Sequence, residues 1–339
     1  MTTSQTTQTA GQTTGDQAPI RVGTRASLLA TTQAGWAADL IRERLGREVV
    51  LVEISTDGDR TQAAGTPLAS YGGTGVFVAE LRDALLRGDV DVAVHSLKDL
   101  PTYPTEGIAL TAVPTREDPR DVVVARDGLT LAELPAGSRV GTGSPRRAAQ
   151  LHALGLGLEI AGIRGNIDTR LRKLRDGEYD AILLARAGLA RIGRLDVITE
   201  VLDPLQLLPA PGQGALGIEC RSDDPLATAL AAVQDPHTRA AVDAERAVLA
   251  TLEGGCSAPI GTLAEVVEGE DGEELWVRAV ALSPDGALAV RRSATGAPGD
   301  ATGVGIRLGE EMLADGASGL AAAQTEDEAV RESDKVRNA

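Results

Sequence analysis

Arginines gather beside helix-start signals in two short stretches of this sequence. In GTGSPRRAAQL (141–151), Ser144 can cap a helix that opens at Pro145, and Arg146 and Arg147 follow directly. The first turn of a helix offers unpaired backbone N–H groups, which bind anions. The stretch therefore predicts an anion site. The alternative is an ordinary strand–turn–helix unit with exposed arginines.

IRGNIDTRLRKL (163–174) repeats this arrangement, with Arg164 and Arg170 on either side of an Asn166 cap. Residues 139–194 contain eleven Arg or Lys and five Asp or Glu, an excess of six positive charges in a chain of formal net charge −16. This reversal favours a focused basic pocket for a small polyanion, because guanidinium groups bind carboxylates or phosphates in pairs. Part of the excess could instead be a solvated helix face.

A second candidate site lies in VHSLKDLPT (94–102), where an apolar strand runs into His95, Ser96, Lys98 and Asp99. In open parallel sheets, ligands bind outside the carboxyl ends of the strands, so polar side chains on such a turn mark a site. The alternative is a solvated loop with a neighbouring Lys–Asp pair.

LEGGCSAPIG (252–261) carries one of the two cysteines of the chain, Cys256, after Gly254 and Gly255. The glycines remove side chains from the approach to the thiol and leave room for a bulky group. No His lies in this motif to form a Cys–His nucleophile, and a packed loop cysteine is the alternative. Cys220 ends an apolar strand and is predicted to be a buried structural thiol.

The remaining polar motifs carry less information. His152 and His237 show no ligand spacing, so we predict no metal site. GGTG (72–75) is too short for a phosphate-binding loop and is interpreted as a glycine hinge of a lid.

The elements that must position these residues alternate between strands and helices, which indicates an α/β fold with parallel, doubly wound sheets. Strands are predicted at 20–24, 49–54, 90–94, 107–113, 122–125, 138–142, 179–185, 260–266 and 274–282. Helices are predicted at 27–45, 77–88, 145–154, 166–175, 238–254 and 302–314. The length of 339 residues favours several domains, and three fit better than two.

Composition excludes several classes of protein. A net charge of −16 argues against nucleic-acid binding and against adhesion to acidic lipid headgroups. No apolar run is long enough for a membrane span. The Thr/Gln-rich start, residues 1–18, is expected to be a disordered leader without the features of a secretory signal, which predicts a cytoplasmic protein with free thiols.

Taken together, the motifs resemble porphobilinogen deaminases, also called hydroxymethylbilane synthases. The resemblance extends from about residue 20 to at least 261 and, more weakly, to about 323. It rests on eight separated motifs in the order of the family: GTRASLLA (23–30), TDGD (56–59), VHSLKDLP (94–101), REDPRD (116–121), GTGSPRR (141–147), IRGNIDTRL (163–171), LPAPGQGALGIECR (208–221) and LEGGCSAPIG (252–261).

The resemblance implies a transferase of haem and porphyrin (tetrapyrrole) biosynthesis. Such enzymes join four porphobilinogen molecules head to tail, release ammonia at each step, and free the linear tetrapyrrole hydroxymethylbilane by hydrolysis. The chain grows on a dipyrromethane cofactor held by a thioether, for which Cys256 matches the attachment position. Each substrate carries acetate and propionate groups, which fits the basic segment.

Residue roles also follow from the resemblance. Asp99 is implied as the catalytic carboxylate that offsets developing positive charge, with Lys98 beside it. Binding of cofactor and substrate is implied for Arg25, Ser27, Asp59, Ser96, Arg146, Arg147, Arg164, Arg170, Arg191 and Gln213. The lid is implied at Gly72, Gly73, Gly75 and Phe77. Ser70 and Thr74 stand where many members carry lysines, so the charge of the lid differs.

The resemblance further implies two lobes like those of periplasmic binding proteins and a smaller α+β C-terminal domain in a monomer. The expected ranges are 19–114 with 214–234 for the first lobe, 115–213 for the second and 235–323 for the third domain, followed by a frayed tail at 324–339. Two rival functions are a non-catalytic polycarboxylate-binding protein on the same fold and a hydrolase or acyl transferase with a Cys nucleophile. The third domain with its thiol disfavours the first, and the absence of an assignable His partner disfavours the second.

Overall fold

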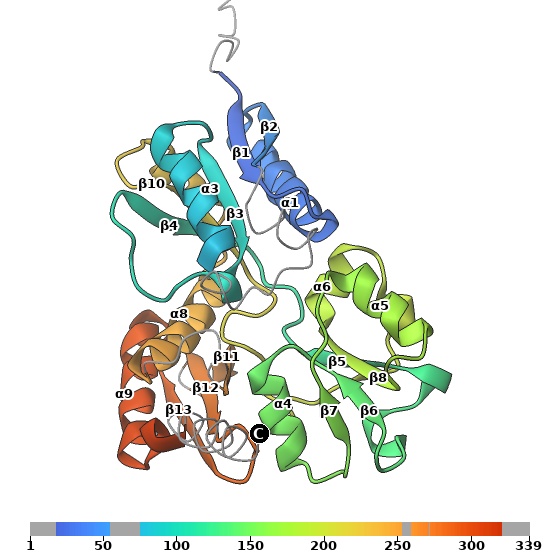
Figure 1. Cartoon of the computed structure of the whole chain (residues 1–339). Helices are drawn as coiled ribbons and strands as arrows, with labels where there is room; N and C mark the ends of the chain where they lie inside the picture. The colour runs from blue at the N-terminus through green and yellow to red at the C-terminus, as the bar shows by residue number, and fades with distance from the viewer. Residues whose placement is uncertain (1–17, 55–74, 253–258, 271, 321–339) are drawn as a thin grey trace, which may run out of the picture.

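Three β-sheets with their helices make up the computed structural model (Figure 1). It describes residues 18–54, 75–252, 259–270 and 272–320. Residues 1–17 of the expected leader, 72–74 of the glycine hinge, 253–258 of the cysteine loop and the charged tail lie outside these ranges. No helix in the described part of the chain combines the length and the apolar character that crossing a bilayer requires.

The first lobe is built on a five-stranded sheet with the order β2-β1-β3-β10-β4. Its strands are β1 (Ile20–Thr24), β2 (Val49–Glu53), β3 (Val92–Ser96), β4 (Ile108–Ala112) and β10 (Leu216–Arg221). Its helices are α1 (Leu28–Leu45), α3 (Gly75–Arg87) and the short α7 (Leu226–Leu230). Helix α1 buries Ala34, Ala38 and Ile41 against one face of the sheet, and the core there also includes Cys220. The prediction of a buried Cys220 is confirmed.

The second lobe has its own sheet, with the order β7-β6-β8-β5-β9 (Figure 1). Its strands are β5 (Asp121–Ala125), β6 (Arg139–Gly141), β7 (Glu159–Ala161), β8 (Ala181–Ala185) and β9 (Glu200–Val201). Its helices are α4 (Pro145–Ala153), α5 (Ile167–Arg175) and α6 (Arg186–Arg191). The predicted caps are present: the side chain of Ser144 accepts from Arg147 N, and that of Asn166 accepts from Thr169 N.

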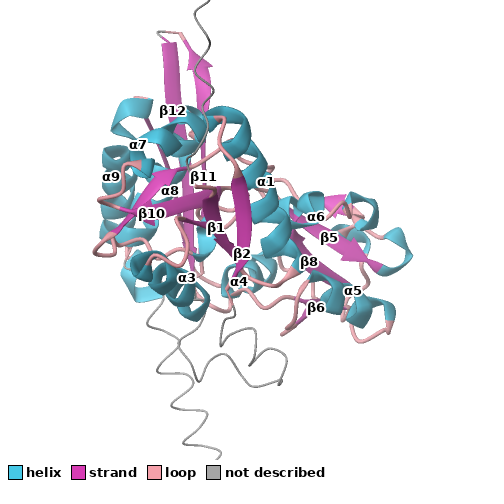
Figure 2. Ribbon diagram, turned by 90° about the horizontal axis from the view of Figure 1, so that it is seen from above, coloured by secondary structure: helices cyan, strands magenta, loops and turns pink. Residues whose placement is uncertain are grey.

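The third unit is an antiparallel meander packed on two helices. Strands β11 (Ile260–Gly269), β12 (Gly272–Leu282) and β13 (Ala289–Gly296) pair in sequence order. Helices α8 (Pro236–Thr251) and α9 (Ala301–Ala314) cover this sheet with an aliphatic core. Figure 2, the view from above, shows the second lobe projecting to one side of the other two units.

Two crossovers connect the lobes, and each delivers a strand that runs against its neighbours. β5 is antiparallel to β8 and β9, and β10 is antiparallel to β3 and β4, so the expectation of parallel strands is wrong for β5 and β10 and the sheet of each lobe is mixed. The reason is the direction of entry: a short crossover brings the chain into each sheet from the carboxyl edge of the other strands. Asp121 therefore lies opposite Ala185, and Leu216 opposite Ser96.

The two crossovers touch each other. Glu117 N donates to Gly214 O at 3.3 Å, and a Cβ at Gly214 would lie 2.3 Å from Glu117 O. Gly214 also has a φ of 88°, which side chains rarely adopt. Glycine is therefore required at this contact between the two crossovers.

A fully buried carboxylate joins the third unit to these crossovers. Glu245 on α8 accepts from Arg116 at 2.7 and 3.0 Å, from Gly212 N at 2.6 Å and from Ala264 N at 2.8 Å. It thereby links both crossovers to β11. A buried carboxylate is tolerated in a protein when it is paired with a cation and hydrogen-bonded, and Glu245 meets both conditions.

Glu245→Gln is expected to lower the melting temperature (Tm) by about 6–10 °C, because it leaves the largely buried Arg116 guanidinium without its counter-charge. Glu265→Gln is the matched control, since Glu265 on β11 forms a largely exposed pair with Arg278 and should change the Tm by about 1 °C or less. Calorimetry measures both values. Equal shifts for the two variants would contradict the assigned role of Glu245.

Candidate active site

The polar turn after β3 faces the second lobe. β3 ends at Ser96, and a single 3₁₀ turn, η2 (Leu97–Asp99), follows. Leu97 is fully buried, and its N–H donates to Ala215 O in the second crossover at 3.0 Å. This anchor fixes the turn so that Lys98 and Asp99 point into the space between the lobes.

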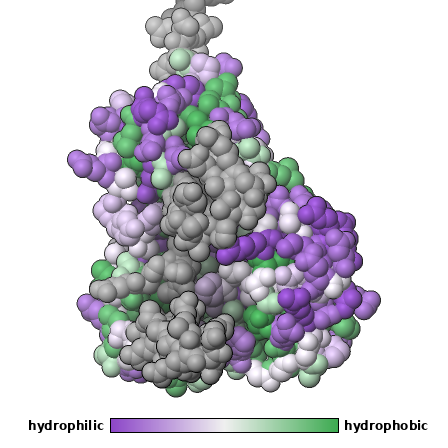
Figure 3. Space-filling view, viewed as in Figure 1, coloured by the Kyte–Doolittle hydropathy of each residue, from purple (hydrophilic) through white to green (hydrophobic). Residues whose placement is uncertain are grey.

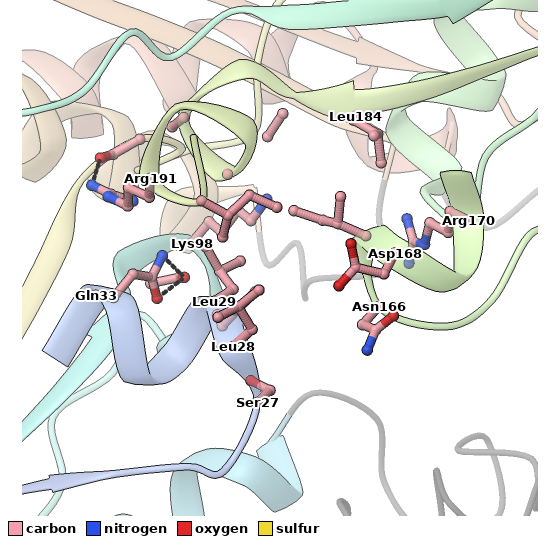
Figure 4. A pocket seen from close by; sticks show the side chains of 18 of the residues that line it. Ser27, Leu28, Leu29, Gln33, Lys98, Asn166, Asp168, Arg170, Leu184 and Arg191 are labelled. Carbon is pink, nitrogen blue, oxygen red and sulfur yellow. Dashed lines mark hydrogen bonds between the residues drawn. The ribbon is translucent and has the colours of Figure 1, made fainter. Parts of the chain in front are cut away.

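A cavity of about 290 Å³ occupies that space (Figure 4). Side chains of α1 and η2 in the first lobe face side chains of α5, α6 and α4 in the second. The polar residues that line it are Arg25, Ser27, Gln33, Ser96, Lys98, Asp99, Arg147, Asn166, Asp168, Arg170 and Arg191. The larger apolar residues are Leu28, Leu29, Ile167, Leu184 and Ile192.

Three guanidiniums form the wall contributed by the second lobe. Arg170 Nε donates to Gly165 O at 2.8 Å, and Arg191 Nη2 donates to Gly214 O at 2.6 Å. Burial lowers the pKa of each of these two arginines to about 10, so both remain cationic at neutral pH. Arg147 lies deeper and donates to Leu183 O at 3.1 Å. The backbone contacts hold the guanidiniums in place and leave other N–H groups for a ligand.

The wall of the first lobe comes from the β1–α1 connection and from α1 itself. Ser27 caps α1, and its side chain accepts from Ala30 N at 3.4 Å. Gln33, one and a half turns into the helix, exchanges hydrogen bonds of 3.0 and 3.1 Å with Ser96 Oγ. This pair ties α1 to the end of β3 and orients the hydroxyl of Ser96 at the cavity.

Lys98 lies at the floor of the cavity, where both lobes enclose its partly exposed side chain. Desolvation lowers the pKa of Lys98 to about 8, with a further lowering by the nearby Arg147 guanidinium, while the Asp99 and Asp121 carboxylates oppose the shift. Lys98 Nζ donates to Gln213 Oε1 at 3.5 Å. An amine of this kind can change its charge near physiological pH, which suits proton transfer.

Beneath the wall lies a completely buried carboxylate, Asp121. It accepts from Arg146 Nη2 at 2.7 Å, from Arg147 Nη2 at 2.6 Å and from Gln213 Nε2 at 2.8 Å. Burial alone would raise the pKa of Asp121, but the two guanidiniums outweigh it and hold the pKa well below its usual range. Asp121 is therefore ionised and is shared between two cations.

Positive charge dominates the cavity. Five cationic side chains line it in the described residues, against the two carboxylates Asp99 and Asp168. Hydrophilic side chains also predominate over the face of the second lobe that carries α5 and α6 (Figure 3). A low-dielectric cleft with excess positive charge attracts small polyanions, and the apolar residues between the cations can pack against the flat faces of rings.

Comparison with known proteins shows the family to which the chain belongs. The chain matches the family model "Porphobilinogen deaminase, dipyromethane cofactor binding domain" over residues 20–229 and "Porphobilinogen deaminase, C-terminal domain" over residues 240–314. The chain belongs to the porphobilinogen deaminase family. It is therefore an enzyme of tetrapyrrole synthesis, a transferase, and contains the cofactor-binding domain of that family.

Curated relatives support the assignment across nearly their whole length. The porphobilinogen deaminases of Mycobacterium tuberculosis and Mycobacterium avium are each 56% identical over 307 residues, which is 89% of this chain and 98% and 96% of theirs. Among solved structures, the methionine-binding protein MetQ aligns at 16% identity with a TM-score of 0.41, over 64% of this chain and 90% of that one.

The structure brings together most of the residues that the motifs singled out. Eight of them line the cavity: Arg25, Ser27, Ser96, Lys98, Asp99, Arg147, Arg170 and Arg191. Gln213 and Arg146 are buried behind the wall, 1% and 4% exposed, and Arg164 is exposed outside the cavity lining. Cys256, Asp59, Gly72 and Gly73 lie outside the described residues. Gly75 opens α3 and Phe77 lies in its first turn.

Two functional candidates were missed by the sequence reasoning. Gln33 sits within an amphipathic helix, where a polar residue on the buried face gives little signal. Asp121 closes the REDPRD motif, but an acidic residue at the start of a strand is indistinguishable from a loop residue until its partners on α4 are known.

The lining fits the cofactor of the family. A dipyrromethane carries several carboxylates on two flat pyrroles, which matches guanidiniums alternating with aliphatic side chains. Arg147 Nε is buried without a partner in the described structure, which leaves a donor available for such a carboxylate.

Proposed function

We propose that this enzyme condenses four porphobilinogen molecules head to tail, with release of ammonia at each step and final hydrolysis to hydroxymethylbilane. The observation that carries the proposal is the cavity itself, where a carboxylate and an amine on one turn face guanidiniums of the second lobe. The cofactor, bound through Cys256, supplies the pyrrole carbon to which the first substrate is joined.

Asp99 is proposed as the catalytic carboxylate. Loss of ammonia from porphobilinogen leaves a cation, and a carboxylate fixed on η2 stabilises that charge as it develops and can accept or return a proton. Lys98, whose pKa is about 8, is proposed to protonate the amino group of the substrate, which then leaves as neutral ammonia. Both groups project from a turn fixed by the buried Leu97, so little reorganisation is needed.

The remaining cavity residues are proposed to bind the carboxylates of cofactor and substrate. Arg25, Ser27 and Ser96 would do so from the first lobe, and Arg147, Arg170 and Arg191 from the second. Arg146 and Gln213 support the wall from behind, and Arg164 and Asp59 would engage the growing chain at its outer end. Gly72, Gly73, Gly75 and Phe77 are proposed to form a lid.

We also propose that the enzyme is a cytoplasmic monomer of three domains: 19–114 with 214–234, 115–213 and 235–323. Sheet membership supports the domain boundaries, because β10 joins the first sheet after the second crossover. One chain supplies both walls of the cavity, so no second copy is needed. Free thiols are maintained in a reducing compartment.

The direct test is to incubate the purified enzyme with porphobilinogen and to follow ammonia and hydroxymethylbilane. We expect four ammonia molecules for each tetrapyrrole released. Binding of porphobilinogen without any ammonia release would favour the rival function, a binding protein for polycarboxylates.

Arg170→Ala is expected to raise the KM for porphobilinogen about 10- to 100-fold, because it removes a charge-assisted hydrogen bond to a substrate carboxylate. Arg172→Ala is the matched control, since Arg172 is exposed on the same helix outside the cavity lining. Steady-state kinetics measure both. Identical KM values for the two variants would place Arg170 outside the binding site.

A further inference from the structure

A series of buried hydrogen bonds connects the two walls of the cavity. Asp121 Oδ1 accepts from Gln213 Nε2, and Gln213 Oε1 accepts from Lys98 Nζ. Gln213 Nε2 also donates to Pro119 O at 2.6 Å, which fixes the orientation of its amide. One continuous chain of contacts therefore runs from α4 in the second lobe to η2 in the first.

Burial makes this network of hydrogen bonds rigid. Asp121 is 0% exposed, Gln213 is 1% exposed, and Arg147 is 6% exposed, so water does not compete for their hydrogen bonds. This network of hydrogen bonds also involves both crossovers, since Asp121 follows the first and Gln213 belongs to the second. Buried hydrogen-bonded networks of this kind fix side chains to within about 0.5 Å.

Charged groups from both lobes surround the Lys98 amine. The groups that face Lys98 are Asp99 on its own turn, Asp121 on β5, and Arg146 and Arg147 on α4. Asp121 offsets part of the repulsion that the two guanidiniums exert on the amine. The cluster keeps a net positive charge, which is suited to a carboxylate ligand.

We propose that Asp121 is a positioning residue for the reaction: its carboxylate holds Arg147 at the cavity wall and, through the Gln213 amide, holds Lys98 beside Asp99. This inference rests on the proposed function for its kinetic consequences. Its geometric content, the link between Asp121 and Lys98, is independent of turnover.

The test measures the pH dependence of acetylation at Lys98 in the full-length enzyme by mass spectrometry after competitive labelling. The chain has three lysines, at 98, 173 and 335, so Lys173 serves as an internal reference. We expect the midpoint for Lys98 to fall by about 1 pH unit in Asp121→Asn, because a favourable charge is lost, and to fall also in Gln213→Leu. Lys173 should not shift.

Asp118→Asn is the matched control, because Asp118 lies three residues before Asp121 and pairs with Arg120 and Arg186 away from this chain of contacts. It should leave the Lys98 midpoint unchanged. An unchanged midpoint in folded Asp121→Asn would overturn the proposal. A shift in Asp121→Asn without one in Gln213→Leu would overturn the bridging role of Gln213. Should Asp121→Asn fail to fold, Gln213→Leu decides, because it leaves no buried charge unpaired.

Kinetics provide the second readout. Asp121→Asn is expected to raise the KM for porphobilinogen about 10- to 100-fold, since misplaced guanidiniums bind carboxylates poorly, while Asp118→Asn stays within about twofold. Absence of turnover in the wild type would defeat the proposed function but leave the labelling result intact. An unchanged KM in Asp121→Asn, with turnover present in the wild type, would overturn the positioning role.

Discussion

Asp99→Asn is expected to fold, to keep its cofactor and to lose about 10³-fold in kcat. The substitution preserves the shape of the side chain on η2 and removes its negative charge. Stabilisation of developing charge in a closed site is worth two to three orders of magnitude, and general acid–base catalysis contributes a similar factor. Single-turnover release of ammonia measures the loss.

The second cavity carboxylate gives the comparison for Asp99. Asp168 projects from the first turn of α5 on the opposite wall (Figure 4). Asp168→Asn should reduce kcat far less, because the proposed catalytic groups lie on the turn after β3 and not on α5. Equal losses in the two variants would mean that the cavity needs negative charge in general and would remove the special role of Asp99.

Cys256→Ala is expected to abolish turnover, because it removes the sulfur to which the cofactor is attached. Cys220→Ala is the matched control: Cys220 is buried in the core of the first lobe, so its loss should reduce stability and leave the cofactor in place. For both variants, ammonia release measures turnover, and the absorbance of the bound pyrroles measures the amount of cofactor. Normal activity of Cys256→Ala would contradict attachment of the cofactor to Cys256.

Much of the fold follows from the sequence because its strands and helices are strongly patterned. The capped helices α1, α4 and α5 begin within a residue or two of the predicted positions, since Ser27, Ser144 and Asn166 are clear start signals. β13 was not predicted, because its exposed side chains, such as Arg291 and Arg292, give no alternation of apolar residues. α6 is only six residues long and was missed for lack of a helical period.

The direction of β5 and β10 could not be read from the sequence. Each has the apolar composition of any buried strand, and its orientation is set by the crossover before it. The same limit applies to the site. Motifs predicted that Lys98, Arg147 and Gln213 belong together, but the hydrogen bonds between them depend on how the two lobes meet.

The central claim is that this cavity holds an oligopyrrole anchored at Cys256 while it grows. Intact-mass spectrometry of the purified enzyme tests the claim most directly, before and after limited porphobilinogen is added. We expect the protein to be heavier than its sequence by two pyrrole units attached to Cys256. Added substrate should then raise the mass in further steps, each of one porphobilinogen less one ammonia. An active enzyme with the unmodified mass, or with the adduct on another residue, would contradict it.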